Sequence, residues 1–171
     1  MLDWLIIGGG IHGTHIALKL KAKGIHNFRI LDPHPHLLEN WKRCTHNTGM
    51  QYLRSPEVHH IGDQPFDLHK FISRSATKQK AYITSNHRPL LSLFNSYSDL
   101  QLETYDLNDL HVKAKATKIS IERNGVSVDT DHGKISARRL ILAIGKSNHL
   151  LWPDWASKLK TQGAQINHIF D

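Results

Sequence analysis

The sequence has little cysteine and no long apolar run. Its single cysteine, Cys44, rules out a disulfide framework within the 171 residues, so the reducing cytoplasm is the expected compartment. No stretch approaches the roughly 20 apolar residues of a membrane-spanning helix, and no membrane partner is expected. The apolar residues 4–7 follow no basic segment and run into glycines, unlike a signal peptide. The composition is otherwise that of a globular domain.

Acidic side chains are fewer than basic ones. The chain has 22 lysines and arginines against 15 aspartates and glutamates, which gives a net charge of +7 when its 14 histidines are neutral. A positive protein favours an anionic partner, such as a dinucleotide, a nucleic acid or an acidic lipid surface. The basic residues are scattered, and no nucleic-acid recognition motif accompanies them. A dinucleotide is therefore the expected partner, and nucleic acid is not.

The start of the chain has the pattern of a strand, a helix and a second strand. Residues 4–7 are apolar, residues 11–23 show the helical spacing of apolar and small side chains, and residues 28–31 fit a second short strand. Gly24 suits the end of the helix, and Asp32 stands at the end of the second strand. The pattern predicts a βαβ unit with parallel strands.

Between the first strand and the helix lies a G-x-G-x-x-G motif, made of Gly8, Gly9, Gly10, Ile11, His12 and Gly13. In such a motif the first glycine makes the tight turn, the second lets the backbone approach a pyrophosphate, and the third lets the helix pack on the strand. The helix N-terminus would bind the phosphates. Asp32 lies 19 positions after Gly13, before Pro33. Its carboxylate suits the hydroxyls of a ribose and disfavours the 2′-phosphate of NADP.

The rest of the sequence predicts helices, then a meander, then a buried strand. Residues 37–64 are loop-rich, while residues 65–74 and 89–102 show helical spacing. An Asn-Gly turn between alternating segments predicts a β-meander over about 111–130. The apolar run 139–144 predicts a strand that is buried on both faces, as in a parallel sheet. The expected fold class is α/β: a Rossmann-like domain with a central parallel sheet, ββα layers and an added β-meander.

This order of elements resembles the FAD domain of flavoproteins with two dinucleotide-binding domains. Ala143-Ile144-Gly145 resembles the small-residue strand end that lies against the cofactor in that family. Residues 41–56, and residues 50–56 most closely, resemble the segment beneath the flavin in lysine/ornithine N-hydroxylase-like flavoproteins. N-hydroxylases usually have proline where this chain has Ile11. The resemblance therefore implies a broader class, an NAD(P)H-dependent flavin oxidoreductase or monooxygenase.

The resemblance also implies FAD as the cofactor and a set of residues that contact it. These residues are Gly8, Gly9, Gly10, Ile11, His12, Gly13, Asp32, Pro33, Gln51, Leu53, Arg54, Ser55, Ala116, Thr117 and Gly145. Residues 51–55 would lie near the flavin, and residues 116–117 near the adenine. Two interpretations of Arg54 stay open: it stabilises a reduced flavin, or it forms a surface ion pair. No catalytic acid or base stands out. No metal is expected, because the histidines follow no known ligand spacing.

The same resemblance implies more chain than this sequence contains. Related chains continue with an NAD(P)H-binding domain that has its own glycine turn, and no such turn follows residue 145 here. We therefore expect an FAD-binding domain in residues 1–150 and, in residues 151–171, a connection toward a missing NAD(P)H-binding domain. Either the chain is a fragment, or a partner chain completes it as a non-catalytic dinucleotide-binding or assembly subunit. NAD(P)H oxidation by this chain alone is not expected, and its FAD affinity is expected to be reduced.

Overall fold

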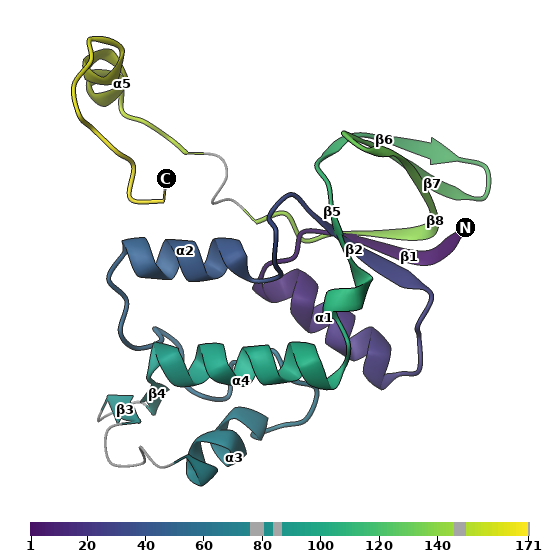
Figure 1. Cartoon of the computed structure of the whole chain (residues 1–171), viewed down its shortest axis with the longest axis horizontal. Helices are drawn as coiled ribbons and strands as arrows, with labels where there is room; N and C mark the ends of the chain where they lie inside the picture. Colours follow the sequence, from purple (N-terminus) through teal and green to yellow (C-terminus); the bar gives the residue numbers. More distant parts are fainter. Residues whose placement is uncertain (76–80, 84–86, 146–149, 171) are drawn as a thin grey trace.

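The computed structural model describes residues 1–75, 81–83, 87–145 and 150–170, and six strands in these residues form one sheet (Figure 1). The strands are β1 (Leu2–Ile7), β2 (Phe28–Asp32), β5 (His111–Lys113), β6 (Ala116–Glu122), β7 (Gly125–Thr130) and β8 (Gly133–Leu142). Their order across the sheet is β5-β2-β1-β8-β7-β6. The pairs β1–β2, β1–β8 and β2–β5 are parallel, whereas β7 is antiparallel to both of its neighbours. The predicted α/β fold with a central parallel sheet is confirmed.

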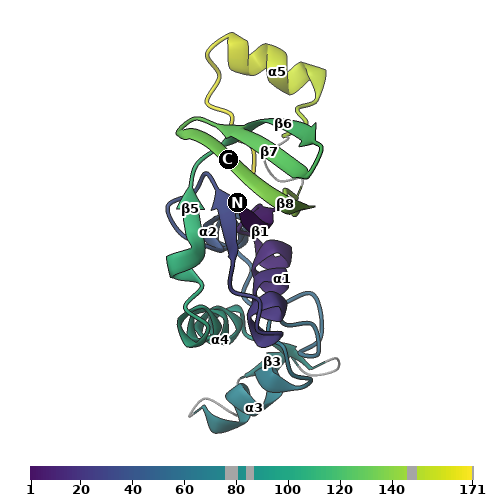
Figure 2. The same ribbon diagram turned by 90° about the vertical axis from the view of Figure 1, so that its right-hand side faces the viewer.

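Helices fill the connections between these strands. The described helices are α1 (Ile11–Ala22), α2 (Glu39–Asn47), α3 (Asp67–Arg74), α4 (Leu91–Thr104), the short 3-10 helix η2 (Asn108–Leu110) and α5 (Asp154–Thr161). A small antiparallel pair, β3 (Tyr82–Ile83) and β4 (Arg88–Pro89), lies near α3 and α4. Helices α1, α3 and α4 lie on one side of the parallel strands, and β6 and β7 curl over toward the other (Figure 2).

Alternate side chains of β1 enter two separate hydrophobic cores. Ile6 packs in the larger core, together with Leu18 of α1 and Phe94 of α4. Leu5 and Ile7 point the opposite way and pack in the smaller core under the antiparallel strands. Successive side chains of a strand alternate between the two faces of its sheet, which explains why a strand covered on both faces is a continuous apolar run. The opening strand, helix and second strand therefore lie where the sequence predicts them.

Strand β8 takes part in both halves of the sheet. Its residues 133–137 pair antiparallel with β7, and its residues 137–142 pair in parallel with β1. The meander thus consists of β6, β7 and β8, whereas β5, at the start of the predicted 111–130 segment, lies beside β2 at the edge of the sheet. The expectation that residues 139–144 are buried on both faces is wrong, because Leu142 and Ile144 are 58% and 57% exposed. These two side chains border a cavity at the end of the strand.

Helix α2 occupies part of the segment predicted to be loop-rich. Leu37 and Leu38, which precede it, are buried in the larger core, and Trp41 packs against that core from the first turn of the helix. The backbone amide of Leu38 donates to the backbone oxygen of Gly9 over 2.8 Å. That bond ties the start of α2 to the glycine turn, so Trp41 lies close to the turn although many residues separate them.

A buried carboxylate holds the segment that leads from α2 toward α4. The hydroxyl of Tyr82 donates to Oε2 of Glu57, and Nδ1 of His69 on α3 lies 3.0 Å from Oε1. The backbone amide of Leu91, at the start of α4, donates to the backbone oxygen of Gln51 over 2.8 Å. Residues 50–60 are therefore anchored at several points and keep a defined position beside α1.

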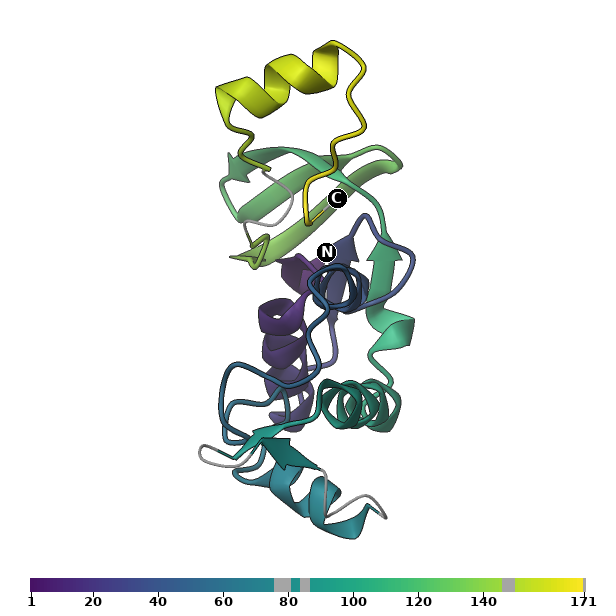
Figure 3. The same ribbon diagram turned by 90° about the vertical axis from the view of Figure 1, so that its left-hand side faces the viewer.

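Helix α5 stands apart from the other helices (Figure 1 and Figure 3). The segment that contains it folds back on itself, and the rings of Trp152 and His168 lie 5.6 Å apart. Phe170 reaches one of the cavities of the main body. Across the described residues, no helix combines the length and the apolar character that crossing a membrane requires.

Candidate functional site

The glycine turn is sterically closed at two of its positions. Gly8 has a φ of +110°, and a Cβ there would lie 2.3 Å from the backbone oxygen of Ala143. A Cβ on Gly13 would lie 1.8 Å from the backbone oxygen of Gly8. Because both obstacles are backbone atoms, they cannot rotate aside as a side chain would. The turn therefore packs α1 directly onto the end of β1 and the segment that follows β8.

Gly10 differs because the space above it is open. Apart from Gly10 and its two chain neighbours, no heavy atom of the described residues lies within 4 Å of the position that its Cβ would take. Gly10 precedes α1, no side chain caps the helix there, and the first turn of the helix contains no acidic residue. The first amide groups of a helix have no acceptor within the helix, and they carry the positive end of its dipole. The position thus has the room and the donors that a phosphate group requires.

Asp32 stands beside the turn at the end of β2, 8% exposed. Its Oδ2 accepts a hydrogen bond of 2.6 Å from the backbone amide of Gly9. Its Oδ1 accepts one of 2.9 Å from the backbone amide of His34, and Nδ1 of the His34 ring lies 2.7 Å from the same oxygen. A carboxylate has about four acceptor positions, so three are in use and one remains for a ligand. Accepting both hydroxyls of a ribose requires the His34 ring to turn away.

Two neighbouring cavities lie at the glycine turn and share part of their lining. The first, here called the sheet-end cavity, has about 690 Å³, and its lining includes Gly8, Asp32, Pro33, Ala116, Thr117 and Leu142. The second, the glycine-turn groove, has about 350 Å³, and its lining includes Gly10, Ile11, His12, Trp41, Cys44 and Gly145. Gly8, Asp32, His34 and Ile144 border both. The combined path follows the carboxyl ends of β1, β2 and β8, where open α/β sheets bind their ligands.

Six of the predicted residues border neither of these two cavities: Gly9, Gly13, Gln51, Leu53, Arg54 and Ser55. Gly9 and Gly13 are buried beneath the turn, so they shape it without facing a cavity. Gln51 and Arg54 are exposed and border neither the sheet-end cavity nor the glycine-turn groove. The structure thus brings the glycine turn, Asp32, residues 116–117 and Gly145 together, and it places Gln51 and Arg54 outside that group.

The predicted set of cofactor contacts left out several residues that line the path, although two of them, Trp41 and Cys44, lie in the segment that resembles the one beneath the flavin. Trp41 and Cys44 come from α2, which was not predicted, although Leu37, Leu38 and Trp41 already have helical spacing. His34 touches Asp32, and nothing in the Pro-His-Pro-His sequence indicated that contact. Two lysines, Lys115 and Lys118, border the sheet-end cavity and contribute positive charge to it.

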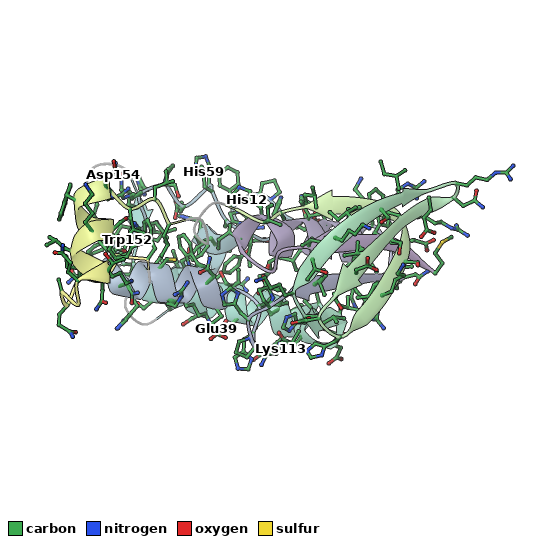
Figure 4. The ribbon with its side chains drawn as sticks, turned by 90° about the horizontal axis from the view of Figure 1, so that it is seen from above. His12, Glu39, His59, Lys113, Trp152 and Asp154 are labelled. Atoms are coloured by element: carbon green, nitrogen blue, oxygen red, sulfur yellow. The ribbon has the colours of Figure 1, made fainter. Side chains whose placement is uncertain are left out.

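A third cavity, here called the histidine pocket, lies on the other side of the first turn of α1. It has about 300 Å³ and is lined by His12, His15, His59, His60, Ser55, Ile11, Trp41, Leu53 and Phe94. His12 and His59 come from different segments and lie on the same side of the molecule (Figure 4). Leu53 and Ser55, both predicted to be near the flavin, border this pocket.

Hydrogen bonds hold two of these histidines at their Nδ1 atoms. Nδ1 of His15 lies 2.9 Å from the backbone oxygen of Ile61. Nδ1 of His60 accepts a hydrogen bond of 3.1 Å from the backbone amide of Gly62, and the hydroxyl of Tyr97 lies 3.3 Å from it. Burial raises the pKa of Tyr97, so its hydroxyl keeps its proton and can donate. The backbone groups of the consecutive residues Ile61 and Gly62 thus orient the rings of His15 and His60.

Burial also lowers the pKa of the His60 imidazole. Asp67 opposes this shift, while the nearby His15 and Lys19 add to it. A histidine whose pKa is lower in the folded chain than its ordinary value of 6.5 favours folding above that value. The stabilisation is lost as the pH falls below it, because the unfolded chain then binds the proton more readily.

We therefore expect the free energy of unfolding to fall between about pH 7 and pH 5, and to fall less in His60→Gln. Urea unfolding at the two pH values measures both slopes. His26→Gln, which changes an exposed histidine, serves as the control and should keep the slope of the parent chain. An unchanged slope in His60→Gln would show that this ring contributes nothing to the acid sensitivity.

The fold is shared with flavin monooxygenases and disulfide reductases of known structure. A flavin monooxygenase from Stenotrophomonas maltophilia, a double mutant, is 20% identical, with a TM-score of 0.64 over 90% of this chain and 41% of its own. Bacillithiol disulfide reductase Bdr from Staphylococcus aureus is 19% identical, with a TM-score of 0.58 over 84% of this chain and 38% of its own. A cyclohexanone monooxygenase mutant from Rhodococcus sp. Phi1 bound to NADP⁺ is 16% identical, with a TM-score of 0.61 over 84% and 26%.

This chain therefore spans about two fifths or less of the length of these structures. No curated protein matches the sequence. The sequence does match one protein family, described as pyridine nucleotide-disulphide oxidoreductase, over residues 5–165. That match covers the glycine turn, Asp32, helices α1 to α5 and, among the described residues, every one that lines the three cavities except Phe170. The chain belongs to the pyridine nucleotide-disulphide oxidoreductase family.

Proposed function

We propose that this chain is the FAD-binding part of a flavin-dependent oxidoreductase that takes its electrons from NAD(P)H. The observation that carries the proposal is the open space at Gly10, in a family member whose other motif glycines are sterically closed. A glycine without a steric need at its own position is explained by a ligand that approaches its backbone. The first amides of α1 are directed to the same place.

The two cavities and the glycine turn between them would bind the successive parts of FAD in order, from the adenosine to the flavin ring. The sheet-end cavity has the volume and the apolar lining for the adenosine, with residues 116–117 beside the adenine and Asp32 beside the ribose. The diphosphate would lie across Gly10 at the N-terminus of α1. The glycine-turn groove would take the ribityl chain and lead the flavin toward Trp41 and Gly145. The positive charge of Lys115 and Lys118 suits a dianionic cofactor.

FAD would supply the redox chemistry, and the chain would bind and orient it. Asp32 would fix the ribose, the turn would hold the diphosphate, and the wall formed by Trp41 and Ile11 would exclude water from one side of the cofactor. Monooxygenases and disulfide reductases share this fold, so the fold alone does not select a substrate. The single cysteine supports a reducing compartment, the cytoplasm.

Titration of the purified chain with FAD tests this function. We expect saturable binding, quenching of flavin fluorescence, and the visible absorption spectrum of flavin that is bound to the chain. Turnover of NAD(P)H is expected only when the remaining part of the enzyme, on the same chain or on a partner chain, is present. If FAD binds and no such completion restores turnover, the alternative of a non-catalytic dinucleotide-binding subunit is favoured. If the chain is colourless once excess free FAD has been removed, the proposal is contradicted.

A further inference from the structure

The histidine pocket lies outside the two cavities assigned to FAD, and its walls are well defined. Phe94 and Leu53 are both 3% exposed and form its apolar floor. The rings of Trp41 and Phe94 meet edge to face, 5.6 Å apart. The indole Nε1 of Trp41 donates to Oδ1 of Asn95 over 3.1 Å, so its polar edge is already occupied. Trp41 therefore presents an apolar ring surface, which suits a flat hydrophobic ligand.

The hydrogen bonds at Nδ1 determine which ring nitrogen carries the proton in each oriented histidine. A carbonyl oxygen can only accept, so Nδ1 of His15 must hold the hydrogen that points to Ile61. A backbone amide can only donate, so Nδ1 of His60 must hold the lone pair that faces Gly62. In the neutral rings the opposite nitrogens follow: Nε2 of His15 is an acceptor, and Nε2 of His60 is a donor.

Both rings line the same small pocket, and in their neutral forms the two Nε2 atoms have complementary hydrogen-bonding roles. Burial lowers the pKa of His60, which keeps its ring neutral at pH 7. Among the residues that the structure describes, no carboxylate lines the pocket, which disfavours a cationic ligand. Among the described residues, no three histidine, cysteine, aspartate or glutamate side chains are arranged to hold a metal ion. The volume of about 300 Å³ lies at the lower end of small-molecule sites.

We infer that the histidine pocket binds a small, neutral ring compound whose polar group both donates and accepts hydrogen bonds, such as a primary carboxamide. The N–H of the ligand would donate to Nε2 of His15, and its carbonyl would accept from Nε2 of His60. The ring would lie against Trp41, Phe94 and Leu53. A carboxylate would lose the bond to His15, because it has no hydrogen to donate, and an ammonium group would lose the bond to His60, because it cannot accept.

The pocket shares Ile11, His12 and Trp41 with the glycine-turn groove. A ligand in it would therefore lie beside whatever occupies that groove. The binding of this ligand does not depend on the proposed function. Its role as the substrate on which the flavin acts does rest on that function. The two can fail separately, and the experiment keeps them apart.

Benzamide is a suitable probe, with benzoate and benzylamine as charged analogues of the same size. We expect benzamide to bind the full chain with a dissociation constant of about 1 mM, as so small a ligand allows. Benzoate and benzylamine should bind at least tenfold more weakly. His15→Ala and His60→Ala should each weaken benzamide binding about tenfold, and His26→Ala should leave it unchanged. Chemical shift titration followed by NMR measures each constant.

The parent chain provides a test that needs no substitution. Long-range proton–nitrogen NMR correlations distinguish the two neutral forms of a histidine, and they should show the proton on Nδ1 of His15 and on Nε2 of His60. Equal affinities for the three probes would overturn the inference, and so would the opposite proton positions. Displacement of benzamide by FAD would also overturn it, because the pocket would then belong to the cofactor. If FAD fails to bind while benzamide still binds, only the proposed function falls.

Discussion

Gly10→Val is expected to remove FAD binding while the fold survives. The backbone of Gly10 has ordinary φ and ψ values of −78° and −170°, and the space around its missing Cβ is open. A valine there has room in the unliganded chain, but its side chain fills the space into which the diphosphate would come. We expect at least a 100-fold loss of FAD affinity, about 2.7 kcal/mol, with a melting temperature close to that of the parent chain.

Gly13→Val provides the matched control, because it places the same side chain three positions further along the motif. Its Cβ would lie 1.8 Å from a backbone oxygen, so α1 would have to move away from β1. We expect a loss of at least about 3 kcal/mol in the free energy of unfolding. Urea unfolding and FAD titration of both variants separate the two roles. If Gly10→Val bound FAD as tightly as the parent chain, the diphosphate would not lie at this turn.

Asp32→Asn is expected to lower FAD affinity about 30-fold and to lower the free energy of unfolding by about 1 kcal/mol. The amide oxygen can replace Oδ2 as the acceptor for the backbone amide of Gly9, but the NH2 group then replaces Oδ1 and leaves the backbone amide of His34 without its acceptor. The lost charge weakens the bonds to the ribose hydroxyls, and bonds to charged groups contribute about 1.5–3 kcal/mol each. Calorimetric titration with FAD measures the affinity, and thermal unfolding measures the stability.

Two further variants show which of these effects belongs to the cofactor. Asp32→Ala leaves the Gly9 amide without an acceptor, so it should lose about 1–3 kcal/mol of stability as well as affinity. His34→Ala releases the acceptor position on Oδ1 that the ring now occupies, so it should bind FAD at least as tightly as the parent chain. A large loss of affinity in His34→Ala would mean that the ring contacts the cofactor and does not compete with it.

The first part of the chain could be predicted because its signals are local. The apolar strand, the spacing of the helix and the glycine turn each lie within a short window, and the carboxylate follows at a known distance. The same reasoning failed for α2, whose few apolar residues begin directly after the Pro33–Pro35 turn. It also failed for the burial of Leu142 and Ile144, since an apolar strand end beside a ligand cavity has the same sequence as one in a core.

The sequence by itself therefore determined the fold class, the place of the glycine turn and the chemistry expected there, because strand and helix periods and glycine backbone freedom act over a few residues. Only the tertiary structure decided that Asp32 accepts a bond from Gly9, that Trp41 borders two cavities, and which nitrogen of His15 holds the hydrogen. The contacts responsible join residues 23 and 46 positions apart, Gly9 with Asp32 and His15 with Ile61. Such contacts depend on how distant segments pack, which no local pattern records.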